Sequence, residues 1–220
     1  GLNGAYNLAS VERGVAGPYG IDPDTATLFK QSGVAASVPY TPTLNPTGAF
    51  SVEFWAKPNV SGNASRAIVG TQNRNTGRAG YAIYQGFNGA WWEAHLGTGE
   101  TVMFLSGSTA PVAGRWDHVV MTWNGQDFAG LYVNGRLEAQ DITARPHRNN
   151  LSQPLEIGSR FNGTVPYSGT IDEVAFYNYA LTPAQIEKHF SIAYFASSIT
   201  SSPEPVLNGG ETSTITLTAA

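Results

Sequence analysis

The chain of 220 residues has no cysteine, few charged side chains and no long apolar run. Without cysteine it has no disulfide, no thiolate metal ligand and no cysteine nucleophile. Charged residues make up 13% of the sequence and the net charge is −4, so no basic field predicts binding to nucleic acid or to an anionic membrane surface. Because no stretch of about 18 consecutive apolar residues occurs, the sequence predicts no membrane insertion.

What the sequence does contain is a series of short strand-like runs. Hydrophobic residues make up 41% of the chain, enough for one substantial core, and 25 glycines and 13 prolines indicate many turns. In residues 49–58 apolar and polar side chains alternate, so that Phe54 faces one way while Glu53 and Trp55 face the other. Similar runs lie at 66–70, 80–85, 90–96, 101–107, 116–124, 128–134, 136–142, 155–159 and 169–177. About ten short strands with almost no helix predict an all-β, two-sheet antiparallel sandwich.

Turns and core positions follow from the same runs. Three Asn-Gly pairs are expected to form type I′ hairpin turns, because Asn and Gly tolerate the positive φ angles of that turn. These pairs are Asn88-Gly89, Asn124-Gly125 and Asn134-Gly135. The alternation also predicts a set of apolar side chains between the sheets: Phe50, Val52, Phe54, Val119, Met121, Leu131, Val133, Val174 and Phe176.

A short, well-capped helix is predicted after the last strand. Thr182 suits the N-cap, Pro183 suits the first helical position, and Gln185 completes a capping box with Thr182. Leu181 before the cap and Ile186 inside the helix are placed to form a hydrophobic staple.

Two motifs identify a family resemblance. Residues 169–186 read G-x-I-D-E-V-x-x-Y-x-x-A-L-x-x-x-x-I, and residues 115–139 read W-x-H-V followed by Y-V-N-G. With the run at 49–58, these segments resemble the laminin G-like, concanavalin A-like jelly-roll domains over residues 1–195. The resemblance implies a jelly-roll sandwich with one short C-terminal helix. It does not fix a function, since lectins, adhesion modules, hydrolases and lyases share this scaffold.

The composition changes after Phe195. Residues 196–220 begin as a Ser/Pro-rich linker and end in an alternating Thr/Ile/Leu run. This segment is expected to be a linker and the start of a following immunoglobulin-like β-sandwich, or else an edge strand added to the main domain. In the first case the chain has neighbouring domains in a longer protein.

Glycosidase chemistry is not indicated by the carboxylates. On this scaffold a retaining glycosidase carries two carboxyl groups on one strand face, about 5 Å apart. Glu53 and Glu93 each lack a partner at that spacing, and Asp172 and Glu173 are adjacent, so they face opposite ways. We therefore expect a non-catalytic module.

A lyase remains as an alternative class of enzyme. Its tyrosine and histidine come from distant strands, and the chain supplies these residue types at Tyr81, Tyr84, His95 and His118. Such a site needs a tyrosine and a histidine within about 3–4 Å in a cleft. His118 lies inside the W-x-H-V motif, where a structural role is the expected one.

A structural calcium ion is the expected cofactor. Calcium takes six to eight oxygen ligands and needs neither cysteine nor histidine. The family resemblance implies that the I-D-E-V strand approaches the N-terminal loop, here residues 17–27, which offers Asp22 and Asp24. Asp172 is two residues before the predicted core residue Val174, so strict alternation would point its side chain into the core as well. A buried carboxylate needs a cation or a set of hydrogen bonds. Asp22, Asp24 and Asp172 are therefore the candidate metal ligands.

A sugar-stacking tryptophan is the candidate ligand site. Trp91 and Trp92 are adjacent in a strand-like run, so at most one of them faces the core. The other offers an aromatic face to the apolar face of a sugar ring. Arg74 and Arg78, together with the basic loop 143–150, would favour acidic or sulfated glycans, because arginine pairs well with carboxylate and sulfate groups.

Together these features predict a carbohydrate-binding or adhesion module of a secreted or cell-surface, multidomain bacterial protein, with a polysaccharide or glycan as partner. A structural spacer domain and a polysaccharide lyase on the same scaffold are the alternatives. A spacer would expose little aromatic surface and bind no glycan.

Overall fold

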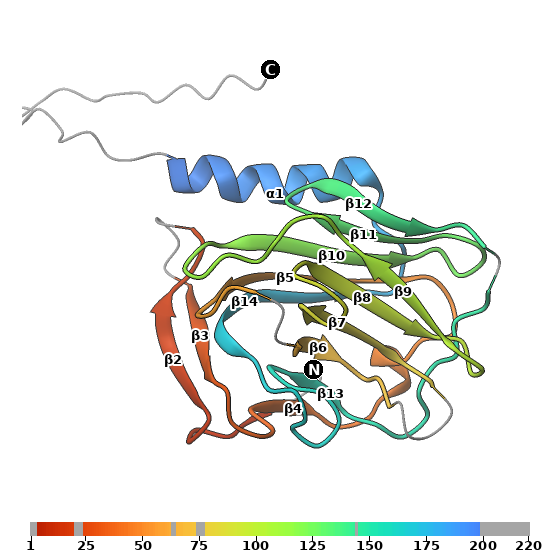
Figure 1. Ribbon diagram of the computed structural model, residues 1–220, viewed down its shortest axis with the longest axis horizontal. Coiled ribbons are helices and arrows are strands. Elements are labelled where there is room, and N and C mark those ends of the chain that lie inside the picture. Colours follow the sequence, from red (N-terminus) through yellow and green to blue (C-terminus); the bar gives the residue numbers. More distant parts are fainter. Residues whose placement is uncertain (1–3, 20–23, 63–64, 74–77, 144, 199–220) are drawn as a thin grey trace, which may run out of the picture.

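The computed structural model describes residues 4–19, 24–62, 65–73, 78–143 and 145–198, with side chains as far as residue 192. Within these ranges the chain forms two seven-stranded sheets, in which the paired strands are antiparallel. Figure 1 shows the sheets packed face to face, with the helix α1 (Pro183–Ser198) along the outside, next to β10, β11 and β12. The predicted all-β jelly-roll sandwich with one short C-terminal helix is confirmed.

Strands far apart in the sequence are neighbours in both sheets, as a jelly roll requires. The first sheet has the order β1 (Ala5–Tyr6), β4 (Ala36–Val38), β13 (Leu155–Ile157), β6 (Arg66–Gly70), β7 (Tyr81–Gln85), β8 (Trp92–Gly97) and β9 (Val102–Ser106). The second sheet has the order β12 (Arg136–Asp141), β11 (Ala129–Val133), β10 (Asp117–Trp123), β5 (Phe50–Pro58), β14 (Ser168–Tyr177), β3 (Thr25–Lys30) and β2 (Val11–Ala16). A single 3-10 turn (Pro42–Leu44) precedes β5.

The strands β1 to β4 were not predicted from the sequence. The run in β2 is mostly exposed and contains Gly14, whose φ is 81°. An edge strand of this kind packs against few side chains and shows no apolar alternation. Residues 25–27, which the sequence analysis assigned to a loop, are the beginning of β3.

The core lies between the two sheets, where the alternation placed it. Seven of the nine predicted side chains are fully buried, and Val174 and Phe176 are partly buried against the same core. Phe54 packs edge-on against Trp92 of the facing sheet, with 6.3 Å between ring centroids. This pair joins the two sheets near the middle of the sandwich.

One of the three predicted type I′ turns is formed. Asn134 and Gly135 have φ angles of 50° and 78° and connect β11 to β12. At Asn124-Gly125 only the glycine has a positive φ, and at Asn88-Gly89 neither residue does. The prediction was wrong at these two pairs because longer connections carry the chain between the strands, residues 124–128 and 86–91.

Because of a β-bulge in β14, the side chain of Asp172 lies on the face of the sheet opposite to the one predicted. Glu173 has a φ of 49°, and the register of β14 against β5 shifts by one residue at this point. Asp172 lies opposite Trp55, so it is on the outer face of the sheet and does not share the inward orientation of Val174 and Phe176. Strict alternation cannot predict such an extra residue.

The helix start matches the prediction. The Thr182 N–H donates to the Gln185 side chain (2.9 Å), and the Gln185 N–H donates to the Thr182 hydroxyl (3.3 Å). Leu181 and Ile186 are both buried in one apolar cluster, as the staple requires. The helix extends to Ser198, beyond the expected boundary at residue 195. Residues 199–220, on which the linker and next-domain predictions fall, lie outside the described residues.

Candidate functional site

Only one of the two adjacent tryptophans is a core residue, in agreement with the expectation that at most one faces the core. Trp92 is fully buried, and its indole N–H donates to the Asp117 carboxylate (3.0 Å). Trp91 keeps 39% of its surface exposed, which is the larger exposure of the pair. Trp92 is therefore a core residue, and Trp91 is the tryptophan available to a ligand.

The turn that carries Trp91 is held in place by a buried carboxylate. Glu93 accepts hydrogen bonds from the backbone N–H of Asn88 (2.5 Å) and from its side-chain amide (2.9 Å). The indole of Trp91 lies directly over Gly89, where a Cβ atom would come within 2.3 Å of the indole nitrogen. The glycine thus lets the indole pack closely against the backbone. A ring fixed in this way loses little conformational entropy when a ligand stacks on it.

The arginines of the predicted site do not lie beside Trp91. Arg78 donates to the backbone carbonyl of Glu100 (2.5 Å), in the turn between β8 and β9. Trp91 precedes β8 at its other end, and six strand residues separate the two positions by about 20 Å. Trp91 and Arg78 can therefore contact the same glycan only if it is long enough to span this distance, and their joint role stays a prediction. Arg74 lies outside the described residues.

The loop 143–150 joins Arg78 at this second end. The side chain of Arg148 lies against Gly99 of the β8–β9 turn, and its backbone N–H donates to Gly97 (2.7 Å). His147 of the same loop is buried against Phe50, and burial lowers the pKa of its imidazole to about 4. His147 is thus a neutral structural residue, whereas Arg78 and Arg148 form an exposed basic pair at one end of the sandwich.

Three carboxylates meet at the bulge in β14. Ligand oxygens of Asp24, Asp172 and Glu173 all lie within 4.8 Å of one another. The carboxylate of Asp172 also lies against Gly17, so the strand does approach the N-terminal loop as predicted. Asp22 lies outside the described residues. Glu173 was not among the predicted ligands, because its turn toward Asp24 depends on the bulge.

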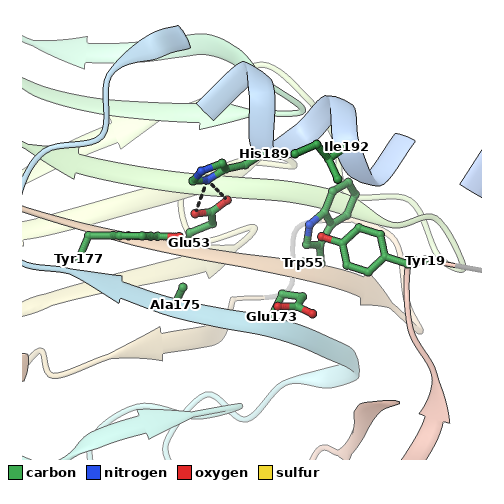
Figure 2. Close-up of a pocket in the computed structure, with 8 residues that line it drawn as sticks. All are labelled: Tyr19, Glu53, Trp55, Glu173, Ala175, Tyr177, His189 and Ile192. Atoms are coloured by element: carbon green, nitrogen blue, oxygen red, sulfur yellow. Dashed lines mark hydrogen bonds and ion pairs between the residues drawn. The ribbon is translucent and has the colours of Figure 1, made fainter. Parts of the chain in front are cut away.

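A cavity of about 230 Å³ lies between α1 and the outer face of the second sheet (Figure 2). Its principal lining residues are Tyr19 from the segment after β2, Glu53 and Trp55 from β5, Glu173 and Tyr177 from β14, and His189 from α1. The sequence analysis assigned none of them to a site. Alternation in 49–58 did place Glu53 and Trp55 on the face opposite the core, and that was the available signal.

Glu53 is the centre of this cavity. Its carboxylate lies 2.7 Å from Nε2 of His118 and 3.0 Å from Nδ1 of His189, and Tyr177 lines the cavity beside it. Burial alone would raise the pKa of Glu53, but the hydrogen bonds and charges of its partners outweigh it and lower the pKa. His118 is fully buried in this network, which is the structural role expected for it.

Burial and the nearby carboxylates raise the pKa of both tyrosines that line the cavity. Burial raises the pKa of Tyr19 to about 12, and the charges of Glu173, Glu53 and Asp172 add to the shift. Burial and the carboxylate of Glu53 likewise raise the pKa of Tyr177. Both hydroxyls therefore stay protonated and can donate hydrogen bonds at neutral pH.

Tyr84 and His95 lie together but not in a cleft. Their rings are 4.5 Å apart, and both residues are fully buried on the outer face of the first sheet. Phe87 and Phe104 each pack edge-on against His95, at 4.7 Å between centroids. The two residue types that a lyase needs are thus enclosed by aromatic side chains. The Tyr84 hydroxyl donates to the side-chain carbonyl of Gln72 (3.0 Å) and accepts from Arg160 (3.1 Å).

Within the described part of the chain, no helix combines the length and the apolar character that a membrane crossing requires.

Comparison with known proteins places the chain in a family. A profile of the concanavalin A-like lectin/glucanases superfamily matches residues 30–187, more than half of the chain. The human adhesion G-protein coupled receptor D1 is 28% identical over 165 residues, which are 74% of this chain and 18% of that receptor. The chain therefore spans less than a fifth of the length of this curated relative.

Solved structures show the same fold. The binding domain of Paraclostridial Mosquitocidal Protein 1 superimposes with a TM-score of 0.67 at 16% identity, covering 88% of this chain and 48% of that one. The CBM40 of the Ruminococcus gnavus IT-sialidase, bound to α2,3-sialyllactose, gives a TM-score of 0.61 at 15% identity, covering 72% and 94%. At these identities the likeness concerns the fold alone. The profile match, together with the two-sheet jelly roll, shows that the chain belongs to the concanavalin A-like lectin/glucanases superfamily.

Proposed function

We propose that this chain is a non-catalytic carbohydrate-binding module and that Trp91 is its contact with the sugar. The observation that supports the proposal best is the exposed indole held over Gly89 on a turn fixed by Glu93. An exposed aromatic ring that packs against a fixed turn can stack on the apolar face of a sugar ring. Neighbouring folds include a domain solved with sialyllactose, which agrees with this use of the scaffold.

The test is a glycan array followed by titration of the best ligand. We compare the wild-type chain with Trp91→Ala and with Tyr40→Ala, which removes another exposed aromatic side chain from the segment after β4. Binding in the micromolar to millimolar range is expected, because a shallow surface buries little area. Trp91→Ala should lose the binding and Tyr40→Ala should keep it. Equal affinity in both variants would refute the assignment of Trp91.

We assign the preference for acidic or sulfated glycans to the basic pair, Arg78 and Arg148, at the other end of β8. A ligand that contacts both Trp91 and Arg78 has to span about 20 Å. A short sugar bound at Trp91 should therefore not contact Arg78. Arg78→Ala should therefore weaken binding of long sulfated or uronic chains and leave short neutral ones unchanged. A loss for short neutral sugars would contradict this division.

The proposal includes a place for the chain in a larger protein. A carbohydrate-binding module serves glycans outside the cell, so we propose a secreted or cell-surface bacterial protein with further domains. The curated relative, of which this chain matches 18%, is itself a much longer protein. If no glycan binds on the array, a structural spacer becomes the better account.

The proposal also assigns a structural calcium ion to Asp24, Asp172 and Glu173. Two oxygens bound to one calcium at 2.3–2.6 Å lie at most about 5 Å apart, and the three carboxylates satisfy this limit. An ion bound only to the folded state raises its stability. EDTA should lower the Tm, added calcium should restore it, and Asp24→Asn should remove the difference. An identical Tm with and without EDTA would rule the ion out.

A further inference from the structure

The cavity beneath α1 combines aromatic walls with buried and rim carboxylates, a pairing suited to a cationic ligand. Tyr19 and Trp55 stand on one side and Tyr177 on the other, with Glu53 between them (Figure 2). Among the described residues that line it, none is lysine or arginine. A cation placed here would meet the electron-rich faces of the rings, the rim carboxylate of Glu173, and the carboxylate of Glu53, which His118 and His189 already contact.

The geometry of the polar groups is fixed before any ligand arrives. His118 and His189 hold the carboxylate of Glu53 from two sides. Tyr19 packs edge-on against Trp55, with 6.0 Å between ring centroids, and the two rings form the side wall. Glu173 is exposed and lies at the rim, because the bulge in β14 turns it out of the strand alternation. The cavity is therefore preorganised, which reduces the entropy cost of binding.

The tyrosine hydroxyls of the cavity lie close enough to the carboxylates to be affected by their charge. Glu173, Glu53 and Asp172 all disfavour ionisation of Tyr19, and Glu53 and Glu173 do the same at Tyr177. The same field that disfavours a phenolate favours a bound cation at that place. The volume of about 230 Å³ is below the range of about 300–1,000 Å³ typical of drug-sized ligands, so the ligand group must be small.

We propose that this cavity binds an alkylammonium group, with the charge between Glu53 and Glu173 and the alkyl part against the aromatic wall and Ile192. The site is separate from Trp91, and the proposal does not depend on carbohydrate binding. The neutral hydroxyl analogue of the same ligand would lose the attraction to both carboxylates.

The probe is butylammonium, with 1-butanol as the neutral control of similar shape. Binding is followed by the NMR signal of the Trp55 indole N–H, because Trp55 lines the cavity. EDTA is present throughout, because Glu173 also belongs to the carboxylate cluster with Asp24. Butylammonium should shift the Trp55 signal in a saturable way with a Kd on the order of millimolar. 1-Butanol should bind at least about tenfold more weakly.

Two variants separate the charge from the fold. Glu173→Gln removes the rim charge of an exposed residue, and we expect about a tenfold loss of butylammonium affinity. Glu100→Gln makes the same change at an exposed residue of the β8–β9 turn and should leave the affinity unchanged. An unaltered Tm in both variants confirms that the fold is intact. Equal binding of butylammonium and butanol, no saturable shift, or wild-type affinity in Glu173→Gln would each overturn the proposal.

Discussion

Each sheet of the sandwich carries a buried glutamate beside a histidine on its outer face, but the two places differ. On the first sheet, Glu93 and His95 are 3.3 Å apart, and both are fully buried. On the second sheet, Glu53 meets His189 at 3.0 Å, and the histidine side chain keeps 33% of its surface exposed. The first pair is enclosed, and the second borders a cavity.

The difference comes from what covers each face. Phe87 and Phe104 pack directly against His95, so side chains of the sheet and its adjoining turn fill the available space. The second sheet is covered by α1, and Leu181 and Ile186 at the start of the helix pack in one buried cluster with Val120 and Tyr132 of the sheet. A helix lying over a sheet leaves gaps wherever its side chains are short or turn aside, and the small Ala175 lies under this one. The same residue types therefore give a structural cluster in one place and a candidate site in the other.

The largest effect is expected from removing the core that both faces share. Phe54→Ala deletes a fully buried ring that contacts Trp92 of the facing sheet. The cavity left behind should lower the free energy of unfolding by about 3–5 kcal/mol. Urea denaturation followed by fluorescence measures it. A loss well under 1 kcal/mol would show that the two sheets do not depend on this contact.

The next largest effect on stability is expected from replacing the two buried glutamates, Glu93 and Glu53, and it should differ between them. Glu93→Gln should lower the free energy of unfolding by about 1–3 kcal/mol, because Glu93 accepts from both N–H donors of Asn88 and lies against His95. Glu53→Gln should cost less, since His189 can turn to water at the open side and the glutamine carbonyl can still accept from the buried His118. Urea denaturation of both variants gives the comparison. A larger loss for Glu53→Gln would reverse the roles assigned to the two faces.

The same carboxylates predict a dependence on pH. Burial raises the pKa of Glu53 and Glu93, but hydrogen bonds from His118 and His95 outweigh it, and both pKa values lie below the ordinary value of 4.5. A lowered pKa contributes stability that is complete above the ordinary value and is lost as pH falls through the folded-state value. The wild-type chain should therefore lose stability below about pH 4.5, and the double Glu→Gln variant should lose less. Denaturation curves from about pH 6 to about pH 3 measure the slopes; parallel slopes would contradict the assignment.

The smallest effects are expected from the side chains that cover the outer face of each sheet. Phe104→Ala removes a ring that closes the first face and should cost about 1 kcal/mol, from the lost contact with His95. Ile192→Ala trims a side chain of α1 that is 57% exposed at the cavity and should cost under about 0.5 kcal/mol. Thermal denaturation of the two variants resolves the difference. Equal losses would mean that the second face is as tightly closed as the first.

The sequence predicted the regular features of this molecule and missed those that depend on irregular backbone. Alternation placed Phe54 in the core and Trp55 outside it, and the cap at Thr182 was readable because its partner is three residues away. The parity of Asp172 was wrong because one extra residue at Glu173 reverses it. Nothing local in the sequence marks such a bulge.

For the candidate sites, too, some features could be predicted from the sequence and others depend on the folded structure. Adjacent tryptophans had to face opposite ways, so one exposed ring could be predicted from spacing alone. The separation of Trp91 from Arg78 depends on which end of β8 each residue occupies, and that is set by strand pairing. The cavity around Glu53 joins residues from the segment after β2, two strands and α1, and only the folded chain brings them together.

The most direct test of the account uses the indole N–H signals of the five tryptophans in a ¹H–¹⁵N spectrum. Trp91 reports on the exposed turn and Trp55 on the cavity beneath α1. The account predicts that a glycan selected on the array shifts the Trp91 signal and leaves the Trp55 signal in place. A glycan that binds while the Trp91 signal stays unchanged, or that shifts Trp55 instead, would contradict it.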